Sequence, residues 1–103
     1  MDFNFKFLPI AEENIEEATD YYAEISVEVL KDFNKQLDLS ISRIITNPYF
    51  QKRYKSVKAF PVKKFPYIIF YEVNEDEKMI YILSVFCTHQ NPEKYPYKSN
   101  NKK

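Results

Sequence analysis

Glycine is absent from this chain of 103 residues. Because glycine lets a backbone approach a phosphate closely, its absence excludes a glycine-rich phosphate loop and a dinucleotide-binding fingerprint. Many nucleotide-dependent enzymes are therefore excluded as function classes. Turns must instead be built from proline, asparagine and aspartate.

Cysteine and histidine occur once each, as Cys87 and His89. One of each falls well short of a zinc signature, so we expect neither a metal nor a cofactor. We expect Cys87 to be a small buried hydrophobe within a strand. No apolar run approaches the roughly 18 residues of a membrane span. The first residues also lack the charged and apolar regions of a signal peptide, so we expect a cytoplasmic protein with no membrane partner.

The net charge is zero, but the two halves of the chain have opposite charge. Residues 1–50 carry ten acids and four bases, a balance of −6, and residues 51–103 carry eleven bases and five acids, a balance of +6. Between residues 51 and 64 there is no acid, and the cations are Lys52, Arg53, Lys55, Lys58, Lys63 and Lys64. This pattern indicates either a basic face for an anionic partner or pairing between the two halves, and the sequence leaves both open.

The first half of the chain predicts a strand followed by two helices. Residues 3–7 alternate apolar and polar side chains, which is typical of a strand, and Pro9 ends it. A helix is predicted over residues 11–23, with Ile15, Ala18, Tyr22 and Ile25 on its buried face. Ser26 is a candidate N-cap for a second helix that runs to residue 46, before Asn47 and Pro48. The two helices are expected to form an antiparallel hairpin.

The second half predicts three strands, over residues 57–62, 67–73 and 79–86. The middle one is continuously apolar and aromatic, which indicates a buried central strand. The expected fold class is therefore α+β: a strand, a two-helix hairpin and then a three-stranded antiparallel meander, with the helices packed on one face of the sheet. We expect residues 1–98 to form a single domain and residues 99–103 to be a disordered tail.

Three segments of the chain resemble the RelE/ParE toxin superfamily. Residues 11–22 resemble the opening of the first helix of that family, and residues 64–72, which begin Lys-Phe-Pro-Tyr, resemble its entry into the central strand. Residues 85–95 resemble the last strand and its His-x-x-Pro exit. The resemblance covers nearly the whole chain, in the family's order.

This resemblance implies the toxin of a type II toxin–antitoxin pair, as in plasmid stabilization, neutralised by a cognate antitoxin protein. ParE-like members poison DNA gyrase, whereas RelE-like members cut messenger RNA on the ribosome. The helical hairpin and the Phe-Pro-Tyr strand favour the ParE-like side, which acts by binding. The cations at residues 52–63 are the expected contacts to target or antitoxin. Whether the assembly is a homodimer or a toxin–antitoxin hetero-oligomer stays open.

Under the ribonuclease alternative, the resemblance implies a catalytic set of Lys64, His89 and Tyr95. Metal-free RNA cleavage needs a base, a cation at the phosphorane and an acid, and a histidine with a pKa near 6.5 suits proton transfer. The chain departs from the family at Asn91, where many members carry arginine before the proline. His89 has no evident carboxylate partner beyond Glu93. The alternatives are therefore a gyrase-binding toxin, a ribonuclease and an inactive toxin fold that only binds a partner.

Overall fold

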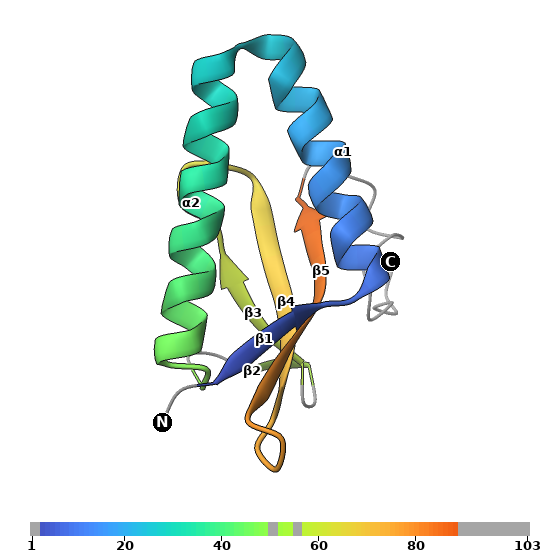
Figure 1. Cartoon of the computed structure of the whole chain (residues 1–103), viewed down its shortest axis with the longest axis vertical. Coiled ribbons are helices and arrows are strands. Elements are labelled where there is room, and N and C mark those ends of the chain that lie inside the picture. Colours follow the sequence, from blue (N-terminus) through green and yellow to red (C-terminus); the bar gives the residue numbers. More distant parts are fainter. Residues whose placement is uncertain (1–2, 50–51, 55–56, 89–103) are drawn as a thin grey trace.

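The structure, a computed structural model, describes residues 3–49, 52–54 and 57–88; for residues 52–54 it describes the backbone only. The elements follow one another as a strand, two helices and four strands (Figure 1), namely β1 (Asn4–Phe7), α1 (Pro9–Ile25), α2 (Val27–Thr46), β2 (Lys52–Tyr54), β3 (Val57–Pro61), β4 (Tyr67–Asn74) and β5 (Met79–Cys87). The two helices form a hairpin that covers one face of the sheet (Figure 1). The predicted α+β class is confirmed.

Local capping chemistry sets the helix boundaries. α1 begins at Pro9, two residues earlier than predicted, because proline lacks the N–H that a first helical position leaves unused. Pro9 therefore starts the helix as well as ending the strand. The Ser26 side chain accepts a hydrogen bond of 3.0 Å from the Val29 N–H and caps α2, as the sequence predicted.

The sheet has the strand order β1-β5-β4-β3-β2. Strands β3, β4 and β5 form the predicted antiparallel meander, and the short β2 adds a further antiparallel strand beside β3. β1 pairs in parallel with β5, from Asn4 opposite Met79 to Phe7 opposite Ile82. A parallel pair needs a long crossover, and the helical hairpin is part of the connection that provides it.

The main core lies between the hairpin and the sheet. Its centre is a group of aromatic rings, in which the Tyr22 ring lies 5.1 Å from Phe33 and 5.2 Å from Phe65, centroid to centroid. On the other face of the sheet, Phe70 and Phe86 form a smaller buried cluster with Ala59. The middle strand is thus buried, as predicted, and supplies both faces of the sheet.

Two predicted burial states were wrong. Ile25 was placed on the buried face of the first helix, but it is 54% exposed, because the hairpin tip extends past the end of the sheet (Figure 1). Cys87 ends β5 and is only half-buried, rather than fully buried. Among the described residues, neither helix is long and apolar enough to cross a membrane.

Candidate functional site

The turn between β3 and β4 carries two of the predicted contact residues, Lys63 and Lys64, both exposed. Phe65 anchors this turn, because its ring packs 5.3 Å from Phe33 in the core. Lys64 has a φ of 75°, a left-handed conformation that costs a residue with a Cβ atom roughly 1 kcal/mol. A chain without glycine has to place another residue here, and the anchored Phe65 holds Lys64 in that conformation.

Lys64 is also held by an ion pair with the second helix. Its Nζ atom lies 3.7 Å from Oδ2 of Asp32, and the two side chains are 59% and 39% exposed. A pair this exposed contributes little to stability because water screens it. Its effect is geometric: it ties the β3–β4 turn to α2 and partly neutralises the cation that the ribonuclease alternative would use on phosphate.

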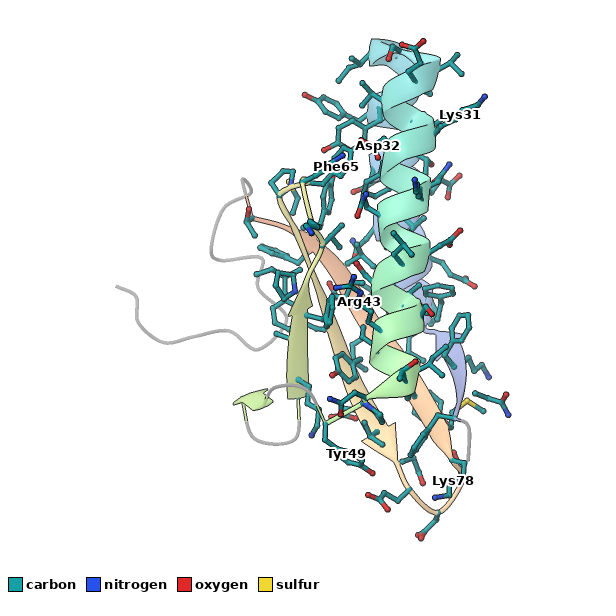
Figure 2. The ribbon with its side chains drawn as sticks, turned by 90° about the vertical axis from the view of Figure 1, so that its left-hand side faces the viewer. Lys31, Asp32, Arg43, Tyr49, Phe65 and Lys78 are labelled. Carbon is teal, nitrogen blue, oxygen red and sulfur yellow. The ribbon has the colours of Figure 1, made fainter. Side chains whose placement is uncertain are left out.

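Two further cations lie on β3 and α2, away from the turn itself. Lys58 is half-buried on β3, and its Nζ lies 5.7 Å from the ring centroid of Tyr49, a cation–π contact. Arg43 is exposed in the last turn of α2, on the same side of the helix as Asp32 (Figure 2). We call Arg43, Lys58, Lys63 and Lys64 the basic edge. The sequence reasoning missed Arg43 because it lies outside the cationic stretch.

For the other predicted site residues, the structure describes either the backbone alone or nothing. Lys52 and Arg53 lie on β2, where the register places Lys52 opposite Lys58. Lys55, His89 and Tyr95 lie outside the described residues. Of the predicted catalytic set, the structure therefore places Lys64 alone, and the catalytic assignment stays a prediction.

A groove of about 500 Å³ lies between α1 and the neighbouring ends of β4 and β5. It is lined by Asn14, Glu17, Ala18, Tyr21, Tyr22 and Ile25 of α1 and by Pro66, Tyr67 and Cys87 of the sheet side. Burial raises the pKa of Tyr67 above its ordinary value, and the nearby Tyr22 and Cys87 raise that pKa further. Burial likewise raises the pKa of Tyr22. Both hydroxyls keep their protons at neutral pH, so they can donate hydrogen bonds but not act as bases.

Asn14 fixes one wall of this groove. Its Oδ1 atom accepts two hydrogen bonds of 3.0 Å, from the hydroxyl of Ser84 and from the N–H of Val85. Both donors belong to buried residues of β5 beyond Ile82, where the pairing with β1 ends. Asn14 thus ties α1 to the stretch of the β5 edge that β1 leaves open.

The acids of α1 are not neutralised by the described bases. Between residues 7 and 30 the chain has seven acids and no base. Between two described side chains, the ion pair found is that of Lys64 with Asp32 on α2. The described residues therefore show no pairing between the acids of α1 and the bases of the second half of the chain. Within those same residues, no group of three His, Cys, Asp or Glu side chains could hold a metal ion.

The sequence matches a family of toxins, and the fold is similar to that of a solved structure. Residues 5–92 match the family model described as the ParE toxin of the type II toxin–antitoxin system, parDE. The fold is similar to a solved structure titled "Chromosomal ParDE TA system from P. aeruginosa", with a TM-score of 0.65 and 15% identity over 81% of this chain and 92% of that one. No curated protein matches the sequence.

Proposed function

Because this chain belongs to the ParE toxin family of type II toxin–antitoxin systems, we propose that it arrests growth by binding DNA gyrase and is held inactive by a cognate antitoxin. The observation that carries the proposal is the family match over residues 5–92. The resemblance of the sequence to ParE-like rather than RelE-like members gives the choice of gyrase.

The basic edge supports action by binding. Lys63 is exposed at the β3–β4 turn, and Arg43 is exposed on α2. The position of the turn is set by Phe65, whose ring packs against the core, and Lys64 lies beside Asp32 of α2. Exposed cations on one surface can steer and orient an acidic protein surface, which a binding toxin requires of its contact residues.

Messenger-RNA cleavage on the ribosome is the second candidate. It rests on Lys64, His89 and Tyr95, which fall where the resemblance places nuclease chemistry. Two features of the chain weigh against it: Asn91 stands where many family members carry arginine, and the charge of Lys64 is shared with Asp32.

Expression of the chain without its antitoxin tests the proposal. We expect growth arrest, loss of supercoiling by purified gyrase, and intact messenger RNA on ribosomes. Lys58→Glu/Lys63→Glu should weaken gyrase inhibition by roughly tenfold or more, because two attractive contacts become repulsive. The matched control is Lys31→Glu/Lys35→Glu, which reverses two exposed lysines on the outer side of α2. Ribosome-dependent messenger-RNA cleavage with unimpaired supercoiling would show that the target is wrong and leave the family standing.

A further inference from the structure

Within the described sheet, the end strand β1 is paired on one side only. The strand order places β5 beside β1 and puts β2 at the opposite end of the sheet. Asn4, Phe5 and Lys6 are exposed, and the large apolar Phe5 is 42% exposed. An end strand presents a row of unpaired backbone N–H and C=O groups, to which a strand of another chain can add.

The hydrogen bonds to β5 use every second residue of β1. The Asn4 N–H donates to the Lys78 carbonyl and the Leu8 N–H donates to the Ile82 carbonyl, each at 3.0 Å. In a parallel pair, a residue that donates to the neighbouring strand also accepts from it, and the next residue turns both groups away. Because N–H and C=O point in opposite directions across a trans peptide, the carbonyls that precede Asn4 and Leu8 also point away from β5. The groups that face the open edge therefore belong to Phe3, Phe5 and Phe7.

The sequence of this segment is nearly symmetric about Phe5. When two copies pair antiparallel with Phe5 opposite Phe5, Phe3 of each copy lies opposite Phe7 of the other, and Asn4 lies opposite Lys6. Three aromatic pairs then meet across the junction, and aromatic cross-strand pairs stabilise a sheet. Moving the centre to Lys6 places two like charges opposite each other, and moving it to Asn4 leaves Phe7 without an aromatic partner.

The lysine on β1 is compatible with this register. A lysine on an edge strand commonly prevents pairing with another chain, because the pairing would bring its charge against an apolar or cationic neighbour. In the register centred on Phe5, Lys6 meets the neutral Asn4 of the second copy, and both residues are exposed in the single chain. The charge therefore selects one register rather than preventing association.

We propose that the open edge of β1 binds the same edge of a second copy of this chain, so that two five-stranded sheets join into one continuous sheet. The contact is isologous and closed, since each copy uses the same edge and neither leaves it free for a third. The inference goes beyond the proposed function and does not depend on the target. The cations of the basic edge on β3 and the β3–β4 turn lie toward the other end of the strand order, so the dimer presents two copies of them.

The size of the contact sets its strength. Five residues from each chain span about 17 Å at roughly 3.4 Å per residue, which is small beside a protein interface of standard size. We therefore expect a weak dimer, with a Kd on the order of 100 μM.

Analytical ultracentrifugation of the purified full chain, from about 10 μM to about 1 mM, measures this Kd. Asn4→Glu places a carboxylate opposite Lys6 twice in each dimer and should lower the Kd by roughly two- to thirtyfold, an effect that salt should screen. Asn4→Lys places like charges there and should raise the Kd by a similar factor. The matched controls, Asn34→Glu and Asn34→Lys, change an exposed asparagine of α2 in the same ways and should alter the Kd by less than about twofold.

Two further measurements test the backbone pairing directly. Phe5→Lys sets two cations against each other on the two-fold axis and should abolish the dimer up to about 1 mM at low salt. Amide hydrogen exchange of the wild type should show protection of the Phe5 and Phe7 N–H groups that rises with protein concentration. The Asn4 and Leu8 N–H groups, which bond to β5, should show the same protection at every concentration.

The Asn4 variants keep the test decisive even where Phe5→Lys fails to fold, because Asn4 is exposed. A chain that stays monomeric at every concentration overturns the inference. A dimer whose Kd is unchanged by both Asn4→Glu and Asn4→Lys uses another surface and also overturns it. Protection of the Phe5 and Phe7 amides that does not depend on concentration has the same consequence, since their groups would then be paired within one chain. Opposite shifts in Kd for the two Asn4 variants, with unchanged controls, would establish the register.

Discussion

Replacing Asn14 by alanine tests how the open part of the β5 edge is held. The change removes the acceptor for the Val85 N–H and the Ser84 hydroxyl, whose residues are 1% and 4% exposed. An unsatisfied buried donor costs about 1–3 kcal/mol. The serine hydroxyl can rotate, so most of the loss falls on the amide, and alanine returns roughly 0.5 kcal/mol through its higher helix propensity. We expect a net loss of about 2 kcal/mol in the free energy of unfolding.

Urea denaturation of the purified chain measures this loss as a shift in the midpoint urea concentration, provided that the m-value is unchanged. For a domain of this size, about 2 kcal/mol corresponds to a fall in Tm of roughly 8–16 °C. Asn14→Asp keeps an acceptor for both donors and should lie between alanine and wild type. Asn34→Ala, at an exposed position of α2, is the control and should be neutral or slightly stabilising. If the unfolding free energies of Asn14→Ala and Asn34→Ala agree within about 0.5 kcal/mol, the hydrogen bonds from Asn14 to β5 do not stabilise the fold as argued.

Three further predictions concern backbone, pH and function. Lys64→Gly should be more stable than Lys64→Val by at least about 1 kcal/mol in denaturant unfolding, since a β-branched residue is disfavoured at a φ of 75°; the reverse order would refute the left-handed turn. Burial raises the pKa of Tyr71 to about 12 from 10.0, so its contribution to stability is complete below pH 10 and is lost as pH rises toward 12. Tyr71→Phe loses the hydrogen bond to the Pro48 carbonyl and about 1 kcal/mol at neutral pH, but its unfolding free energy should fall less steeply above pH 10; an equal decline would contradict this cause. His89→Ala at matched expression should leave growth arrest largely intact, whereas abolished arrest by a folded variant whose wild type cuts messenger RNA would favour the ribonuclease.

The candidate site was only partly predictable, because several of its contacts join distant parts of the chain. The sequence identified the cationic stretch, and the structure places Lys58, Lys63 and Lys64 of that stretch on β3 and the following turn. It could not show that Lys64 pairs with Asp32 or that Arg43 lies on the same side of α2. These relations depend on how α2 rests against the turn, which no local pattern specifies.

Local chemistry in the sequence determined the elements themselves. The Ser26 hydroxyl caps α2 within one helical turn, Pro9 fits the first position of α1, and the change from helical periodicity to short apolar and aromatic runs marks where the last two strands begin. These signals act over a few residues, so they can be found without knowing the fold.

Tertiary structure alone decided the relations between distant residues. The parallel pairing of β1 with β5 joins Asn4 to Met79, and Asn14 reaches Val85 only because that pairing ends at Ile82. The exposure of Ile25 follows from how far the hairpin extends past the sheet, since helical periodicity places a residue on a face but does not show what covers that face. The groove beside α1 therefore could not be predicted: it exists because a strand ends early and a helix continues.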